Sequence, residues 1–287
     1  GNYRISTINE DSQTKIKIFD IKNNNMLMLP NLNNGFISSV NISDSENKLS
    51  FYHGGARSPN DLYFKNIKGD KVKKLTNSMN PSINKKYLGE AKIVRFISFD
   101  GLEIPAVYYK PPNASSDNKM PALVRVHGGP GGQARVGYRA STQYLVNNGY
   151  AILDINNRGS GGYGKTFQTL DDQAHSKGDL DDCLAAIDWL KEQGHIDGGR
   201  IGILGGSYGG YMVMAAMAFR PDAFNVGVNI YILRSLSRPC SITYSYNLSE
   251  LAICGTIFGF TTEPISIDSG LYLVIIVSRS SFFSSSV

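Results

Sequence analysis

The chain contains 287 residues, of which 41% are hydrophobic, and it carries a formal net charge of +5 at pH 7. This size and composition are typical of a soluble globular protein with one large domain or two smaller ones. The positive charge is spread through lysine-rich loops of the first half, such as residues 68–74, without a dense basic run. This pattern argues against nucleic-acid binding, so we expect no nucleic-acid partner.

Cysteine content argues against a disulfide-stabilised or metal-binding protein, and the short apolar runs argue against a membrane protein. Cys183, Cys240 and Cys254 are too few for a disulfide framework, and none has the spacing of metal ligands. The apolar stretches are short, with seven residues in Leu271–Val277 and nine in Tyr211–Phe219, whereas a membrane-spanning helix needs about 20. We therefore expect no metal site and no membrane anchor. The chain starts at Gly1 without a charged and then apolar leader, which leaves its location unknown, with the cytoplasm slightly favoured, and its oligomeric state open.

Residues 1–79 have the pattern of short β-strands separated by Asn, Ser, Asp and Gly turns. An internal repeat of 46 residues runs through them, which is close to the length of a four-stranded propeller blade, about 40 to 50 residues. We interpret this segment as the C-terminal remnant of a β-propeller, and the alternative is a chance similarity between two polar β-meanders. The repeated positions are Ile5, Ser12, Ile16, Ile18, Ile21 and Lys22, which recur as Phe51, Ser58, Leu62, Phe64, Ile67 and Lys68.

Residues 80–230 predict a different fold class. The later strands are apolar throughout, as expected for parallel strands that are buried on both faces. A helix is predicted over residues 180–193, where apolar residues recur at three- and four-residue steps. Strands that alternate with helices indicate an α/β domain with a mostly parallel sheet. The six predicted strands are residues 93–97, 104–109, 122–126, 151–155, 201–204 and 226–230.

The composition changes again near Ile230. Residues 231–287 are rich in serine, and no lysine occurs after Lys191. The segment has strand-like fragments but no regular helical periodicity. We interpret it as an atypical tail produced by a reading-frame change or a gene-model error.

A glycine-rich turn at residues 205–210 lies between a predicted strand and a helix predicted at residues 211–219. This context is typical of a nucleophile elbow, in which a serine is held in a strained conformation and flanking glycines let the helix cross the strand closely. Ser207 is the candidate nucleophile, with Gly205 and Gly209 as the supporting glycines. The alternative is a purely structural glycine turn.

A second glycine-rich loop, residues 127–132, follows the strand that ends at Val126. Parallel strands present their carboxyl ends at one edge, so this loop is expected beside Ser207, where backbone N–H groups of the loop and of Tyr208 would face an oxyanion. A phosphate-binding loop is the competing interpretation. It is disfavoured because no Lys-Ser/Thr pair follows the glycines.

The chain resembles the prolyl oligopeptidase family of serine peptidases. The resemblance rests on these two loops, on residues 98–104 and 157–164, and on the helical series Asp182, Ala186 and Leu190. The resemblance is strongest to its bacterial dipeptidyl and acylaminoacyl-peptidase branch. It covers roughly residues 1–230, which implies an α/β-hydrolase domain preceded by the last propeller blades, in a family member truncated at both ends. It also implies cleavage of short peptides through an acyl-enzyme, without cofactor or metal.

The resemblance assigns residues to an active site. It implies that Ser207 is the nucleophile, that Tyr208 and Gly129 supply oxyanion N–H groups, and that Arg158 braces the loops. For Arg158 an ordinary surface position is the alternative. The residues that support the site are His127, Gly128, Arg158, Gly205 and Gly209.

The triad lacks a recognisable base, because none of the four histidines follows Ser207 as the family order requires. His195 precedes the strand that leads to Ser207, so it belongs at the opposite edge, roughly 17 to 20 Å away. His127 belongs to the oxyanion loop, where a structural hydrogen bond is expected, and His175 is expected to face solvent. The remaining histidine, His53, lies in the propeller segment.

No aspartate fits the triad either. Asp222 lies in a helix-end turn, and Asp268 has no neighbouring histidine to orient. We therefore expect a family member that is impaired or inactive in this chain. The alternatives are a noncatalytic pseudo-peptidase that binds peptides or partners, and a small-ester hydrolase with a replacement base such as His127.

Overall fold

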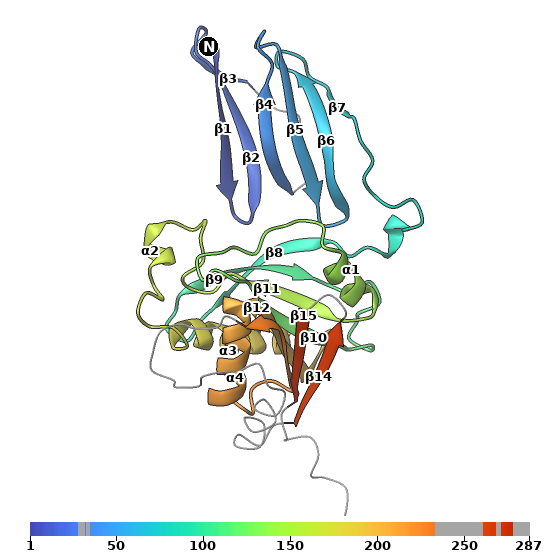
Figure 1. Cartoon of the computed structure of the whole chain (residues 1–287), viewed down its shortest axis with the longest axis vertical. Coiled ribbons are helices and arrows are strands. Elements are labelled where there is room, and N and C mark those ends of the chain that lie inside the picture. The colour runs from blue at the N-terminus through green and yellow to red at the C-terminus, as the bar shows by residue number, and fades with distance from the viewer. Residues whose placement is uncertain (28–31, 33–34, 233–260, 268–270, 278–287) are drawn as a thin grey trace, which may run out of the picture. The chain divides into compact units, whose positions relative to one another are not determined.

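The computed structural model describes residues 1–27, 32, 35–232, 261–267 and 271–277, with the backbone alone from residue 231 onward. The chain divides into two compact units, each built from several segments (Figure 1). The predicted domain boundaries at residues 79 and 230 stay predictions. The first unit contains Gly1–Ile93, Tyr109–Pro112 and Arg135–Asn148, and the second contains Val94–Tyr108, Asn113–Ala134 and the chain from Gly149 onward.

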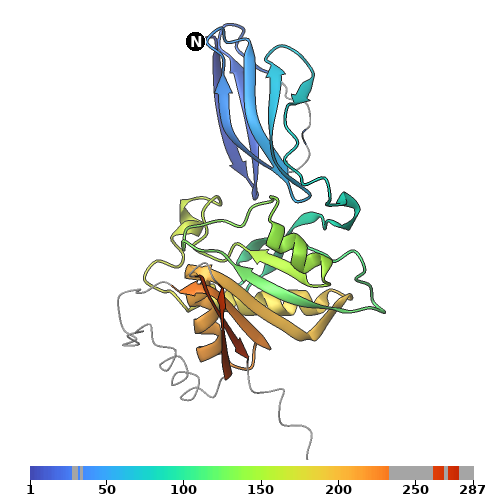
Figure 2. The same ribbon diagram turned by 45° about the vertical axis from the view of Figure 1, so that its right-hand side comes forward.

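The first unit holds a three-stranded and a four-stranded antiparallel sheet, drawn in blue to cyan in Figure 2. A four-stranded antiparallel meander is the unit of a propeller blade. Short helical elements η1 and α1 also belong to this unit. The bounds are β1 Tyr3–Glu10, β2 Gln13–Asp20, β3 Asn25–Leu27, β4 Phe36–Ile42, β5 Lys48–Gly55, β6 Ser58–Asn66, β7 Val72–Lys74, η1 Lys85–Tyr87 and α1 Ala140–Asn147.

The repeat in the sequence corresponds to a repeated hairpin. The β1–β2 hairpin of the first sheet matches the β5–β6 hairpin of the second, so Ile5 and Phe51 occupy equivalent strands. Alternate side chains of both hairpins point into one shared apolar cluster, in which Ile18, Leu49 and Phe51 are fully buried. Both sheets are therefore antiparallel meanders, of three and four strands, as the sequence repeat predicts.

Asp61 of β6 links that strand to the segment that follows β7. Its buried carboxylate accepts hydrogen bonds from Thr76 and from the backbone and side chain of Ser78, and it pairs with Lys74 at 2.6 Å. Burial alone would raise the pKa of Asp61, but these partners lower it to about 2. The ionised side chain therefore stabilises the folded sheet.

We expect Asp61→Asn to destabilise the first unit by roughly 2 kcal/mol at pH 7. Because the folded pKa lies below the unfolded value, the difference should be complete above pH 4 and should vanish as the pH falls towards 2. Calorimetric unfolding of the whole chain between pH 2 and 7 measures it. The exposed Asp44→Asn serves as the control. A constant difference between wild type and Asp61→Asn down to pH 2 would contradict the assignment.

The second unit is built on an eight-stranded sheet with the order β14-β15-β13-β12-β10-β11-β9-β8. The four central strands, β11, β10, β12 and β13, are parallel, as predicted. All six predicted strands are present. The bounds are β8 Ala91–Ile97, β9 Glu103–Tyr109, β10 Met120–Val126, β11 Ala151–Ile155, β12 Ile196–Ser207, β13 Val226–Ile232, β14 Thr261–Ile267 and β15 Leu271–Val277.

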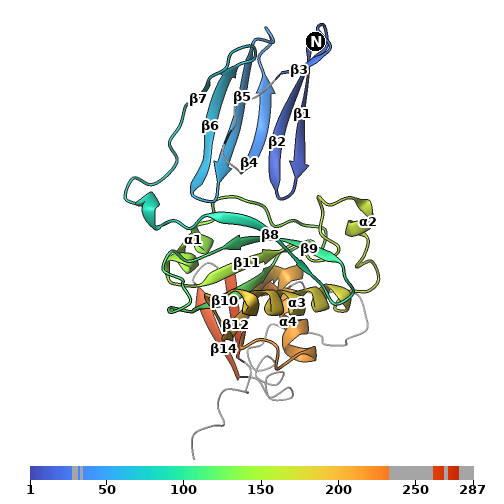
Figure 3. The same ribbon diagram turned by 180° about the vertical axis from the view of Figure 1, so that it is seen from behind.

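The helices of this unit are α2 (Lys165–Gln168), α3 (Gly178–Glu192) and α4 (Tyr208–Phe219). Helix α3 packs on β10, β11 and β12, and α4 packs on β10, β12 and β13 beside α3 (Figure 3). The core between them and the sheet contains fully buried Val124 and Met212. Because the strands are apolar and covered by helices, the charged and glycine-rich segments lie in the loops at the strand ends. Among the described residues, every helix is too short or too polar to cross a membrane.

Beyond β13 the described sheet continues with a hairpin. Strand β15 pairs antiparallel with β13, and β14 pairs antiparallel with β15. The apolar run Leu271–Val277 therefore forms strand β15. Asp268, Cys240 and Cys254 lie outside the described residues, and the interpretation of residues 231–287 as an atypical tail stays a prediction.

Candidate active site

Strand β12 ends at Ser207 and helix α4 starts at the next residue, so the chain turns from strand to helix without a connecting loop. Ser207 has φ 58° and ψ −125°, in the left-handed half of backbone space that side chains rarely adopt. Such a conformation costs of order 1–3 kcal/mol and persists only when the surrounding structure enforces it. The serine hydroxyl is thereby placed at the tip of the turn.

Two glycines allow the backbone of helix α4 to contact the backbone at the ends of β10 and β12 directly. A Cβ atom on Gly205 would lie 2.3 Å from the carbonyl oxygen of Gly209. A Cβ atom on Gly209 would lie 2.1 Å from the carbonyl oxygen of Val126 at the end of β10. No side chain fits at either position, so the close packing of α4 against β10 and β12 holds Ser207 in its strained conformation.

We expect Gly209→Ala to destabilise the second unit by about 1–3 kcal/mol or more, because the added methyl group meets rigid backbone. Gly194→Ala is the matched control, since a Cβ atom there meets nothing within 4 Å. Its effect should stay within about 0.5 kcal/mol. Thermal unfolding of the two variants measures the difference. Equal melting temperatures would show that the helix can shift without cost.

The second glycine-rich loop flanks the nucleophile. Val126 pairs with Gly205 in the parallel register, so β10 and β12 end at the same edge. A Cβ atom on Gly128 would lie 3.1 Å from Cβ of Ser207 and 3.4 Å from its Oγ. Gly129, with φ 140°, continues the loop in a conformation that favours glycine. The backbone of this loop therefore borders the serine hydroxyl.

His127 takes part in holding this loop. Its Nε2 lies 2.8 Å from Oγ of Ser160, and its Nδ1 lies 2.8 Å from the carbonyl oxygen of Gly128. Oγ of Ser160 in turn donates to the carbonyl oxygen of Asn157 at 2.6 Å, so the hydroxyl links the ring to the loop that carries Arg158. Both ring nitrogens thus have partners on the two neighbouring loops, which agrees with the structural hydrogen-bonding role expected for His127.

No described residue forms a hydrogen bond with the Oγ atom of Ser207. His195 lies immediately before the first residue of β12, whereas Ser207 is its last, so the two are at opposite ends of one strand, as expected. Nε2 of His195 instead lies 2.7 Å from the hydroxyl of Tyr108. His53 lies in β5 of the other unit. Within the described chain, neither of these histidines serves Ser207.

His175, which was expected to face solvent, is half-buried, with 29% of its side chain exposed. Its Nδ1 lies 2.8 Å from the hydroxyl of Tyr208, the residue after the nucleophile, and the two rings pack edge to face. The buried Tyr208 hydroxyl also donates to Asp179, and burial together with this carboxylate raises the pKa of Tyr208. The polar sequence around His175 gave no sign of the contact, because Tyr208 lies 33 residues further along the chain.

Arg158 is buried and ion-paired, which excludes the alternative of an ordinary surface residue. Its guanidinium donates to both carboxylate oxygens of Asp182 on α3, at 2.9–3.2 Å, and to both oxygens of Asp100. Burial alone would lower the pKa of Arg158, but these carboxylates raise it. Ser98 donates to Asp182 at 2.6 Å. One arginine therefore joins three segments on which the family resemblance rests.

Asp182→Ala should destabilise the second unit by about 3–5 kcal/mol, because it leaves the buried Arg158 guanidinium without its main partner. Asp188→Ala, an exposed position on the same helix, should change stability by less than about 0.5 kcal/mol. Urea unfolding followed by the fluorescence of Trp189, the single tryptophan, measures both. A small effect of Asp182→Ala would mean that Arg158 is not tied to this helix.

An open cavity of about 470 Å³ lies beside the second glycine-rich loop. It offers space next to Pro130 and Gly131, the neighbours of the predicted oxyanion donor. Both charge signs occur in its wall. The lining residues are Pro130, Gly131, Gly159, Lys165, Gln168, Thr169, Asp171 and Asp172.

Comparison with known proteins agrees with this geometry. Residues 136–236 match the model of the prolyl oligopeptidase family. Dipeptidyl aminopeptidase BIII of Pseudoxanthomonas mexicana is 39% identical over 118 residues, which is 41% of this chain and 17% of that protein. The chain spans less than a third of the length of the first curated relatives that it matches.

Two solved structures resemble the fold. The acylaminoacyl peptidase of Pyrococcus horikoshii is 29% identical with a TM-score of 0.65, over 77% of this chain and 34% of that one. An acylaminoacyl peptidase in complex with Z-Gly-Gly-Phe-chloromethyl ketone is 26% identical with a TM-score of 0.62, over 78% of this chain and 36% of that one. The likeness confirms the predicted fold class, an α/β-hydrolase domain with a mostly parallel sheet preceded by β-propeller blades.

Proposed function

Because this chain belongs to the prolyl oligopeptidase family of serine peptidases, we propose that Ser207 is the nucleophile of an acyl-transfer site in a peptidase domain spanning residues 80–230. Its hydroxyl oxygen attacks a peptide carbonyl and displaces the amine, and water then releases the acyl group. The observation that carries the proposal is the strained backbone of Ser207 at the junction of β12 and α4.

Negative charge on the attacked oxygen would be stabilised by the backbone N–H groups of Tyr208 and Gly129. Tyr208 opens helix α4, whose N-terminus favours negative charge. Gly129 follows Gly128, which borders the Ser207 side chain. His127 and Arg158 act as positioning residues, since they hold the two loops through Ser160, Asp100 and Asp182.

Short peptides are the substrates that we propose. One relative is named a dipeptidyl aminopeptidase, and a solved relative was captured with a peptide chloromethyl ketone. The open cavity beside Pro130 and Gly131 offers room for part of a peptide next to the second glycine-rich loop. No cofactor or metal takes part in this acyl-transfer chemistry.

We propose further that the activity is strongly impaired in this chain. A serine hydroxyl needs a base to remove its proton, and no histidine follows Ser207. Removing the histidine from a serine triad lowers kcat by on the order of 10⁶-fold. The nearby His127 has Ser160 and Gly128 as partners, which disfavours the alternative of an esterase that uses His127 as its base.

A fluorophosphonate probe tests the proposal, since it labels activated serines. We expect slow labelling that Ser207→Ala abolishes, and amide hydrolysis slower by about 10⁶-fold than that of a relative with a complete triad. The control is Ser116→Ala, an exposed serine of the same unit, which should label as the wild type does. Rapid labelling of Ser207 would contradict the impairment, and labelling that persists in Ser207→Ala would contradict the nucleophile.

The noncatalytic alternative is favoured by one observation, the absence of a hydrogen-bond partner for Oγ of Ser207 among the described residues. It predicts peptide binding without turnover. Binding of a fluorescent peptide that Ser207→Ala leaves unchanged, together with no labelling by the probe, would favour a pseudo-peptidase. Hydrolysis of p-nitrophenyl esters but not of aminoacyl amides would favour the esterase.

A further inference from the structure

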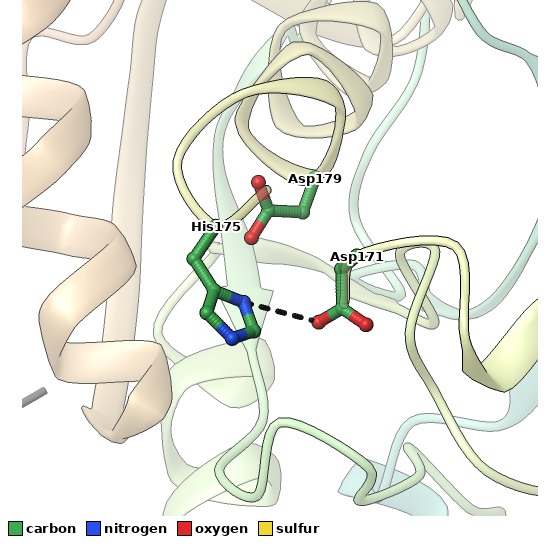
Figure 4. A group of neighbouring side chains, drawn as sticks. All are labelled: Asp171, His175 and Asp179. Atoms are coloured by element: carbon green, nitrogen blue, oxygen red, sulfur yellow. Dashed lines mark ion pairs between the residues drawn. The ribbon is translucent and has the colours of Figure 1, made fainter. Parts of the chain in front are cut away.

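Three side chains that take no part in the acyl-transfer step converge near the Tyr208 hydroxyl (Figure 4). Asp171 lies in the turn after α2, His175 lies in the loop before α3, and Asp179 lies in the first turn of α3. One ligand atom from each lies within 4.8 Å of the other two. The three come from a single stretch of nine residues that folds back on itself, so the arrangement is local and well defined.

Both carboxylates of this group are buried. The side chain of Asp171 is 2% exposed and that of Asp179 is fully buried. Asp179 accepts hydrogen bonds from Tyr208 and from the backbone of Leu180. Oδ2 of Asp171, in contrast, accepts no hydrogen bond from the described residues and lies 3.4 Å from Nδ1 of His175. A buried carboxylate oxygen without a donor is costly unless a cation neutralises it.

The Asp171 carboxylate fits against the chain only because residue 159 is a glycine and has no side chain. A Cβ atom on Gly159 would lie 2.2–2.3 Å from the carboxylate carbon and both oxygens of Asp171. Gly159 also has φ 92°, a conformation that favours glycine. The carboxylate is therefore packed against the bare backbone of the Arg158 loop and points towards the histidine.

We propose that Asp171, His175 and Asp179 bind a divalent transition-metal ion of the zinc type. Imidazole nitrogen and carboxylate oxygen are ligands of Zn²⁺ at about 2.0–2.2 Å. Nδ1 of His175 lies 3.4 Å from Oδ2 of Asp171 and 2.8 Å from the Tyr208 hydroxyl, so binding an ion requires Nδ1 to lose its proton and to exchange the Tyr208 contact for the metal. Two carboxylates and one neutral imidazole neutralise a doubly charged cation.

The surroundings supply the other parts of such a site. The Tyr208 hydroxyl donates to Asp179, which is the kind of outer contact that orients a ligating carboxylate. Asp171 and Asp172 line the open cavity of about 470 Å³, through which an ion and a fourth, water ligand can enter. The ion would tie the turn after α2 to the first turn of α3. Its role is structural and does not depend on peptidase activity.

Titration of the EDTA-treated full chain with Zn²⁺ tests the proposal by calorimetry and thermal unfolding. We expect one bound ion per chain and a higher melting temperature. Asp171→Asn and His175→Gln should each weaken binding by roughly tenfold or more and remove the thermal shift. The matched controls are Asp172→Asn, the neighbouring carboxylate, and His195→Gln, a histidine at the other end of β12. Both should bind as the wild type does.

A Cys240→Ser/Cys254→Ser variant should also retain the ion, because we propose that Asp171, His175 and Asp179 supply the ligands. Loss of binding in this variant, or unchanged binding in Asp171→Asn and His175→Gln, would overturn the proposal. Absence of binding in the wild type would mean that Asp171 and His175 form an ion pair only.

A second readout needs no variant. Diethyl pyrocarbonate modifies histidines, and mass spectrometry reports each site. Zn²⁺ should protect His175 and leave the modification of His195 unchanged. Equal modification of His175 with and without Zn²⁺ would contradict coordination, even if the variants fail to fold.

Discussion

The contact of backbone with backbone between α4 and the ends of β10 and β12 is the constraint on which the second unit depends. Gly205 and Gly209 leave no room for a side chain, so the helix starts within van der Waals distance of both strands. The chain can make this connection only if Ser207 takes a left-handed conformation. Strain at one residue is thus maintained by packing spread over the whole helix.

The loops at the strand ends are also held by electrostatic interactions. The buried guanidinium of Arg158 spans the turn at Asp100 and the helix at Asp182. Buried ion pairs contribute little net stability compared with apolar contacts, but an unpaired partner costs much. The arrangement therefore specifies the position of the loops more than it adds to their stability.

The sequence predicted the parts that depend on local patterns. Buried parallel strands have continuous apolar runs, and the glycine spacing around Ser207 allows few structures other than an elbow. The partners of Arg158 and the contact between His175 and Tyr208 were not predictable, because they join segments distant along the chain without a periodic signal. The same reason applies to Asp171, whose surroundings depend on the backbone of Gly159.

The interleaved composition of the two units has a consequence for synthesis of the chain. The first unit needs Tyr109–Pro112 and Arg135–Asn148 in addition to its N-terminal segment, so its sheets cannot gain all their contacts before Asn148 has left the ribosome. Domains generally fold as units during translation, N-terminal first. Here strand β10 leaves the ribosome while the first unit still lacks its last segment. For the same reason, a single cut by a protease cannot separate the two units into intact halves.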